Sequence, residues 1–145
     1  MKSLLLVAAT IGAMTVLGAR RPEAPSEPTH SVWDSVYTEA QSVRGDSLYR
    51  VGCATCHGAT LAGTDDGTPL TGDAFLGNWN GLTLAELYDK IRSTMPPETP
   101  ETIPPDQVTG MLAYLLAQNH FPPGKTALTA DVDRLKDIKV VASRP

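Results

Sequence analysis

The sequence contains little cysteine, few aromatic residues and no excess of positive charge. Its two cysteines, Cys53 and Cys56, are three positions apart, so they cannot form a disulfide framework that joins distant parts of the chain. Aromatic residues make up 6% of the 145 residues, and their side chains supply only a modest apolar interior. The formal net charge of -4 disfavours nucleic acid as a partner. A cofactor that completes the core and uses the two cysteines would account for these features.

The first residues have the composition of an export signal. Lys2 precedes an apolar run that ends at the small residues Gly18 and Ala19. We therefore predict a signal peptide over residues 1–19 and a periplasmic protein. The alternative is an uncleaved membrane anchor, because about 17 apolar residues is the lower limit for crossing a bilayer. Membrane contact would follow only in that case.

The rest of the chain predicts a proline-rich flexible linker and one all-α domain. The linker is expected over residues 20–35 and the domain over residues 36–145. Apolar residues recur at helical spacing in three segments, and no strand-like alternation is present. A glycine-rich ordered loop is expected over 58–78, and a short helix over 129–136 that buries Val132 and Leu135. The three main helices are expected from Val36 to the cysteines, from Thr83 to Thr94 and from Pro105 to Asn119.

Residues 53–57, Cys-Ala-Thr-Cys-His, form the C-x-x-C-H pattern of covalent haem attachment. Thiols three residues apart near a helix end lie on one side, where each can form a thioether with a haem vinyl group. His57 then provides an imidazole nitrogen for the iron. A redox-active or zinc-binding C-x-x-C is the alternative, but a thioredoxin-type site needs a βαβ context and zinc needs two further ligands. The pattern favours one covalently bound haem c with iron.

Met95 is the best candidate for the second axial ligand of the iron. It lies at the end of the second predicted helix and is followed by Pro96 and Pro97, which stiffen the chain after it. A thioether ligand raises the reduction potential relative to a second imidazole. An ordinary core methionine is the alternative interpretation of Met95. His120 and His30 are weaker candidates for the ligand, and Met111 fits the apolar stripe of the third helix.

In these motifs and their order, the chain resembles a class I c-type cytochrome from about Val36 to Val140. The resemblance implies the cytochrome c fold, with Gly45, Tyr49 and Tyr114 at the crossing of the first and last helices. It implies that the carbonyl of Pro69 accepts the second N–H of His57, with Leu70 packed on the same side of the haem. Trp79 would donate its indole N–H to a haem propionate or, alternatively, fill the core.

More narrowly, the stretch from Phe75 to Trp79 and the Phe121-Pro-Pro-Gly turn are similar to cytochrome c domains that accompany bacterial quinoprotein dehydrogenases. The resemblance implies a periplasmic electron carrier rather than an enzyme. Its implied partners are a donor dehydrogenase or quinol-oxidising complex and an acceptor such as an oxidase or reaction centre. Two alternatives stay open: a haem enzyme or gas-binding module with an open sixth site, and a haem subunit of a larger membrane redox complex.

Overall fold

The computed structural model describes residues 28–144 and contains mainly helices, as the sequence predicts. The predicted signal peptide and the first half of the predicted linker, residues 20–27, lie outside these residues. No helix within residues 28–144 is long and apolar enough to cross a membrane. In chain order the elements are β1 (His30–Ser31), a 3-10 helix η1 (Val32–Asp34), α1 (Glu39–Gly52), α2 (Ala54–His57), α3 (Gly72–Trp79), α4 (Leu84–Thr94), α5 (Pro105–Gln118), α6 (Val132–Lys136) and β2 (Ile138–Lys139).

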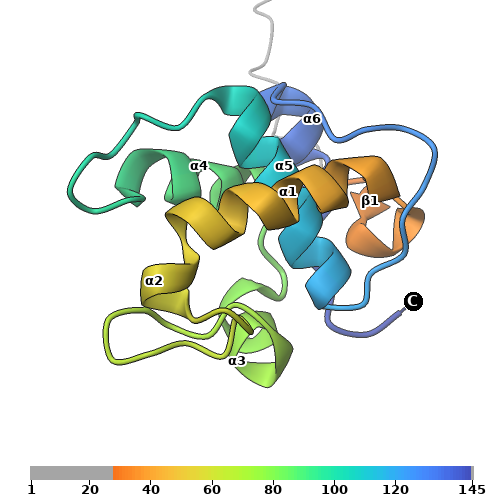
Figure 1. Ribbon diagram of the computed structural model, residues 1–145. Helices are drawn as coiled ribbons and strands as arrows, with labels where there is room; N and C mark the ends of the chain where they lie inside the picture. The colour runs from red at the N-terminus through yellow and green to blue at the C-terminus, as the bar shows by residue number, and fades with distance from the viewer. Residues whose placement is uncertain (1–27, 145) are drawn as a thin grey trace, which may run out of the picture.

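Helices α1 and α5 cross at the centre of the fold (Figure 1), and their backbones approach each other closely at this crossing. A Cβ atom at Gly45 would lie 2.0 Å from the carbonyl oxygen of Gly110 and 2.8 Å from Cβ of Tyr114. The rings of Tyr49 and Tyr114 pack beside the crossing, with their centroids 5.3 Å apart. The positions that the resemblance implied therefore do meet, and Gly110 is the partner that the sequence did not reveal.

Helix α4 begins and ends where the sequence predicts. The Thr83 side chain accepts a hydrogen bond from the Glu86 N–H, and the Glu86 carboxylate accepts one from the Thr83 N–H. The hydrogen bonds that the Glu86 carboxylate accepts from the Thr83 N–H and from the Thr83 hydroxyl lower the pKa of this carboxyl. The helix stops at Thr94 because Met95, which precedes Pro96, has extended geometry with φ -124° and ψ 139°.

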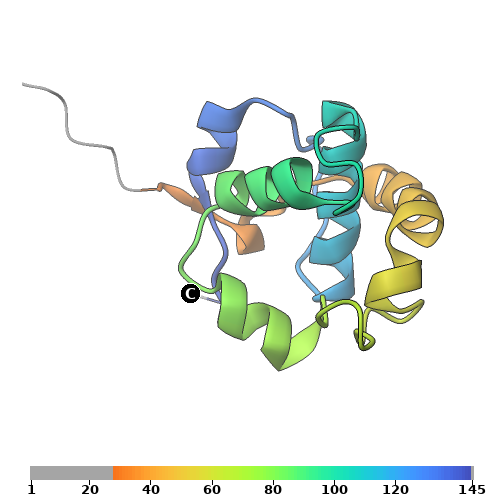
Figure 2. The same cartoon turned by 90° about the vertical axis from the view of Figure 1, so that its left-hand side faces the viewer.

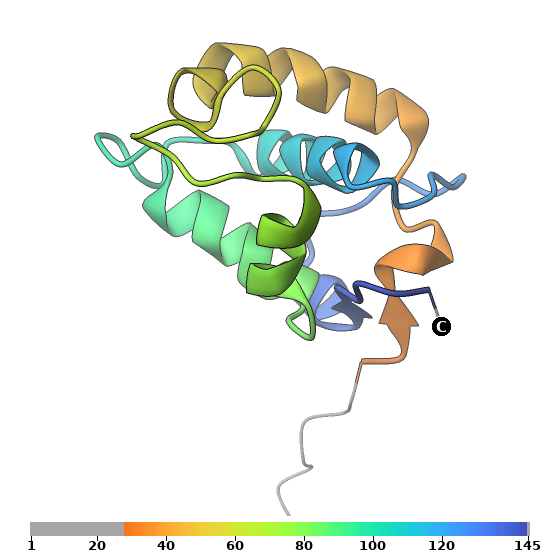
Figure 3. The same cartoon turned by 90° about the horizontal axis from the view of Figure 1, so that it is seen from below.

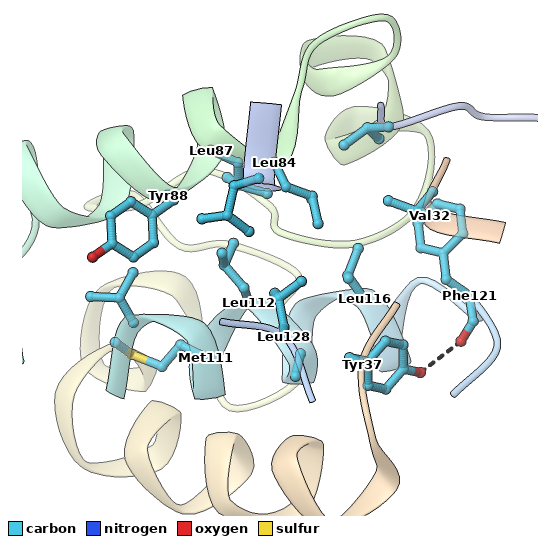
Figure 4. Packing of buried hydrophobic residues seen from close by; sticks show 14 of the residues in the cluster. Val32, Tyr37, Leu84, Leu87, Tyr88, Met111, Leu112, Leu116, Phe121 and Leu128 are labelled. Carbon is cyan, nitrogen blue, oxygen red and sulfur yellow. Dashed lines mark hydrogen bonds between the residues drawn. The ribbon is translucent and has the colours of Figure 1, made fainter. Parts of the chain in front are cut away.

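Buried residues of α4, α5 and the two ends of the described chain form the main core (Figure 4). The Tyr37 hydroxyl donates to the Phe121 carbonyl at 2.6 Å. Gln41, which is 4% exposed, exchanges two hydrogen bonds with the backbone of Leu128. These contacts fix the long connection after α5 against the start of α1 without leaving buried polar groups unpaired.

The prediction of a flexible linker was wrong for residues 30–34, which form β1 and η1 and belong to the folded domain. Val32 is fully buried, and the ring of Trp33 packs edge-on against Phe121 with centroids 4.9 Å apart. The Trp33 indole N–H donates to the Val141 carbonyl at 2.9 Å, and β1 pairs with β2 in parallel. Proline and polar residues dominate the linker composition, so its two anchoring side chains were not recognised as core.

Three helix predictions need correction. Helix α1 begins at Glu39 rather than Val36, because the Thr38 side chain caps its first turn. Residues 72–79 form α3 within the segment that was predicted to be a loop. The short C-terminal helix begins at Val132, which is 42% exposed, whereas Leu135 is buried as predicted.

Candidate haem site

Cys53, Cys56 and His57 converge on one side of a cavity of about 350 Å³. Cys53 follows α1, and the single turn α2 beyond it (Figure 2) contains Cys56 and His57, which line the cavity with Cys53. Burial raises the pKa of the Cys53 thiol, and Cys56 nearby raises it further. The Cys53 thiol also lies 3.6 Å from the Met111 sulfur. The local helical turn thus presents both thiols and the imidazole to the same space.

The walls of this cavity are apolar and come from α4, α5 and the loops. They include Leu70, Leu87, Ile91, Ile103, Met111 and Leu115. No group of three or more His, Cys, Asp or Glu side chains within residues 28–144 is placed to hold a metal ion by itself. Two thiols, one imidazole and one thioether around an apolar space suit an iron porphyrin, whose ring needs apolar walls and whose iron accepts nitrogen and sulfur ligands.

The His57 imidazole is oriented by a backbone carbonyl, but the carbonyl belongs to Thr68. Nδ1 of His57 lies 2.8 Å from the Thr68 oxygen. The assignment of this role to the Pro69 carbonyl was therefore wrong by one residue. A residue before proline is restricted to extended geometry, and this restriction fixes the direction of the Thr68 carbonyl. A carbonyl partner requires the proton on Nδ1, which leaves Nε2 free for a metal.

A tight turn over residues 63–68 holds the end of α2 in place. The Gly63 N–H donates to the His57 carbonyl at 3.0 Å, and the Thr64 hydroxyl donates to the Cys56 carbonyl. Gly67 lies directly against this end, because a Cβ atom there would be 2.6 Å from the Cys56 oxygen and 3.0 Å from Nδ1 of His57. In the sequence, the only sign of this turn is the glycine content of the loop.

We expect Gly67→Ala to destabilise the protein by about 1–3 kcal/mol, because the added methyl group has no room beside Cys56 and His57. Denaturant unfolding measures this loss, and the NMR shift of the His57 Nδ1 proton reports the movement of the ring. Gly77→Ala is the matched control, since a Cβ atom at Gly77 meets no atom within 4 Å. Equal stabilities of the two variants would contradict the tight packing at Gly67.

Met95 faces the same cavity as the three residues of the C-x-x-C-H motif. Its N–H donates to the Ile91 carbonyl at 3.0 Å, which fixes it at the end of α4. Pro96 and Pro97 also line the cavity, so the segment after Met95 follows its wall. His120 and His30 do not line this cavity, and His30 lies on β1 with Asp137 3.8 Å away. The structure therefore brings Met95, and neither rival histidine, to the site.

Leu70 and Trp79 were also predicted to contact the haem, and the structure supports this contact only for Leu70. Leu70 lines the cavity, and its N–H donates to the Leu61 carbonyl at 2.8 Å. Trp79 does not line it; its ring packs near Phe75, with centroids 6.5 Å apart, against the main core. The core role that the sequence left open for Trp79 is the one that the structure favours.

Tyr49 lines the cavity in addition to its predicted position at the crossing of α1 and α5. Its side chain lines the cavity while its hydroxyl donates to the Gly58 carbonyl at 2.7 Å. Burial raises the pKa of Tyr49 to about 12, with smaller contributions from Cys53 and Tyr114. The phenol therefore stays neutral at physiological pH and adds no charge to the apolar wall.

A C-x-x-C-H turn that closes an apolar cavity among three main helices defines a c-type cytochrome. The comparisons agree, because residues 40–115 match the family described as cytochrome c oxidase, cbb3-type, subunit III. This match covers more than half of the chain, and the chain belongs to that family, whose domain is a mono-haem class I c-type cytochrome. The family implies covalently bound haem with iron and haem-based electron transfer.

A solved structure shows the same fold. The crystal structure of the sulfane dehydrogenase SoxCD from Paracoccus pantotrophus matches with a TM-score of 0.52 and 24% identity. The match covers 85% of this chain and 68% of the other. No curated protein gives a significant match to the sequence.

Proposed function

We propose that this protein is an exported one-electron carrier with a single haem c bound by four side chains. Cys53 and Cys56 would form the thioether links, and His57 and Met95 would be the axial ligands. The observation that carries the proposal is that all four side chains line one apolar cavity. With both axial positions filled by protein, the site would have no place for a substrate, and the protein would act as a carrier rather than an enzyme.

The residues around the cavity favour electron exchange over other chemistry. When bound, the haem supplies an iron that alternates between the ferric and ferrous states. The Thr68 carbonyl holds the His57 ring in one tautomer and one orientation. The neutral thioether of Met95 would favour the ferrous state. With the haem bound, Leu87, Ile91 and Leu115 would pack against it and keep water away, which would reduce the reorganisation that accompanies each electron transfer.

Export and the choice of partners are part of the same proposal. The predicted signal peptide over residues 1–19 would deliver the chain to the periplasm, where covalent haem attachment suits a carrier that must not lose its cofactor. The expected partners are a donor dehydrogenase or quinol-oxidising complex and an acceptor oxidase or reaction centre. The likeness to a structure titled as a sulfane dehydrogenase supports a dehydrogenase among the donors. Uncleaved residues 1–19 would instead make the protein a membrane-attached subunit.

Optical spectroscopy of the purified holoprotein tests the proposal. We expect one covalent haem per chain, low-spin ferric iron with a sulfur-to-iron charge-transfer band, and no rapid binding of carbon monoxide by the reduced protein. These results would show that both axial positions are filled. High-spin ferric iron and rapid carbon monoxide binding would instead support a haem enzyme or a gas-binding module.

A further inference from the structure

Two loops border the cavity that receives the haem, and both lie on the face of the molecule that carries α2. The loop over residues 58–71 follows α2, and the loop over residues 96–104 follows α4 (Figures 1 and 2). The first is held to α2 by the hydrogen bond from Thr64 to the Cys56 carbonyl. The second is held to α4 by the Glu101 N–H, which donates to the Arg92 carbonyl at 2.9 Å. Thr68 and Leu70 of the first loop line the cavity, as do Pro96, Pro97, Glu98 and Ile103 of the second, so the two loops together form a rim at its mouth.

The rim is acidic. It contains Asp65 and Asp66 in the first loop and Glu98 and Glu101 in the second, and neither loop contains lysine or arginine. All four side chains are exposed. None of them forms a salt bridge within the part of the chain that the structure describes. Their charges are therefore directed to solvent rather than neutralised inside the protein.

Positive charge is concentrated elsewhere. The C-terminal segment over residues 122–144 contains five lysines and arginines against three aspartates. This segment packs with β1 and η1, away from α2 (Figure 3). Lys90 is the one lysine or arginine among the residues that line the cavity, and Arg92 lies beside the second loop, which its carbonyl binds; against the four carboxylates, these two cations leave the rim with a net negative charge. The molecule thus has an acidic face around the haem cavity and a basic segment away from it.

The cavity that the acidic rim borders is lined mainly by apolar side chains. Val51 does not line the cavity, but it lies in the last turn of α1, two residues before Cys53; it is 88% exposed and is the most exposed large apolar residue of the described chain. Pro97, which lines the cavity, is also exposed. An apolar centre within a charged border is the usual anatomy of a protein interface.

We propose that this acidic rim, defined by Asp65, Asp66, Glu98 and Glu101, is the docking surface for a redox protein whose own docking surface is basic. The inference rests on the proposed function and adds the sign of the partner's charge to it. Long-range attraction between the rim and basic side chains would orient the partner over the cavity mouth before contact. The exposed side chains of Pro97, at the cavity, and of Val51, beside the cysteine segment, would then provide close apolar contact.

Small charged redox reagents can measure the field at the cavity mouth. We would follow oxidation of the reduced holoprotein by anionic ferricyanide and by cationic tris(1,10-phenanthroline)cobalt(III) in a stopped-flow instrument, from about 10 mM to about 1 M ionic strength. We expect added salt to slow the reaction with the cationic complex and to accelerate the reaction with the anionic one. A salt effect of about tenfold or more is expected for a focused negative field.

Two double variants and a matched control locate the charges responsible. Asp65→Asn with Asp66→Asn, and Glu98→Gln with Glu101→Gln, should each flatten the salt dependence for both reagents. The control variant, Glu39→Gln with Asp133→Asn, removes the same number of exposed charges, but from the start of α1 and from α6. We expect it to leave the salt dependence of both reactions nearly unchanged. Equal effects of the control and the rim variants would overturn the proposal, because the net charge alone would then explain the field.

An oligolysine peptide serves as the probe for a basic protein surface. We expect its addition at low salt to shift the NMR signals of residues 64–67 and 97–101, and we expect the shifts to vanish at high salt. Shifts elsewhere, or none, would count against the rim. A holoprotein that exchanges electrons with both reagents at rates independent of salt would refute the docking surface and leave the carrier function intact. A protein that exchanges electrons with neither reagent would refute the carrier function itself.

Discussion

Replacing Met95 with alanine is expected to abolish the sulfur-to-iron charge-transfer band and to lower the reduction potential. An alanine side chain offers no ligand at this position, so water or an external ligand would occupy it. The expected fall in potential is on the order of 0.1 V or more, within the roughly 0.8 V range that axial ligation spans. A redox titration of the variant, together with its ferric spectrum, measures both effects, and carbon monoxide should then bind to the reduced protein.

Met111→Leu is the control for this experiment. Met111 lines the same cavity and is 5% exposed, but leucine keeps its apolar volume within the core. We expect this variant to retain the charge-transfer band. If the band survives in Met95→Ala and disappears in Met111→Leu, then Met111 is the ligand and our assignment is wrong.

Gly45→Ala is expected to destabilise the protein strongly. The new methyl group would lie 2.0 Å from the Gly110 carbonyl oxygen, a backbone atom that cannot move without separating α1 from α5. Because this crossing carries both the cysteine segment and one wall of the cavity, we expect a loss of about 3 kcal/mol or more. Thermal and denaturant unfolding of the purified holoprotein provide the measurement.

The opposite glycine of the same crossing provides a matched control. A Cβ atom at Gly110 would lie 3.5 Å from Cδ1 of Leu48, which is an ordinary contact. Alanine also favours the helix over glycine by about 0.8–1.0 kcal/mol. Gly110→Ala should therefore be neutral or slightly stabilising. Similar losses for the two variants would show that the crossing is more symmetric than the structure indicates.

The parts of the site that depend on local sequence were predictable. Two cysteines three positions apart and the histidine after them are presented to one side by a single helical turn, and the structure places all three side chains on the cavity. The end of α4 at Met95 follows from the proline after it, and the start follows from the reciprocal cap of Thr83 and Glu86.

The parts that depend on distant contacts were not predictable in the same way. The carbonyl that accepts the hydrogen bond from the His57 Nδ1–H is determined by how the turn over residues 63–68 folds onto α2. For this reason the acceptor is Thr68 and not, as the sequence predicted, Pro69. Trp33 looked like part of a linker because its partners, Phe121 and Val141, lie far along the chain. Trp79 resembled a haem contact because of its sequence context, although α3 turns it toward the core.

The pairing of the described ends of the chain has a practical consequence for handling the protein. Strands β1 and β2 join these ends on the side of the molecule opposite α2 (Figure 3). A protein immobilised on an electrode or a resin through either end would therefore turn the mouth of the cavity outward, toward the solution. Linkage through the exposed acidic rim would instead turn the mouth toward the solid support. The two orientations of one immobilised protein would separate direct electrode contact from exchange with a dissolved partner.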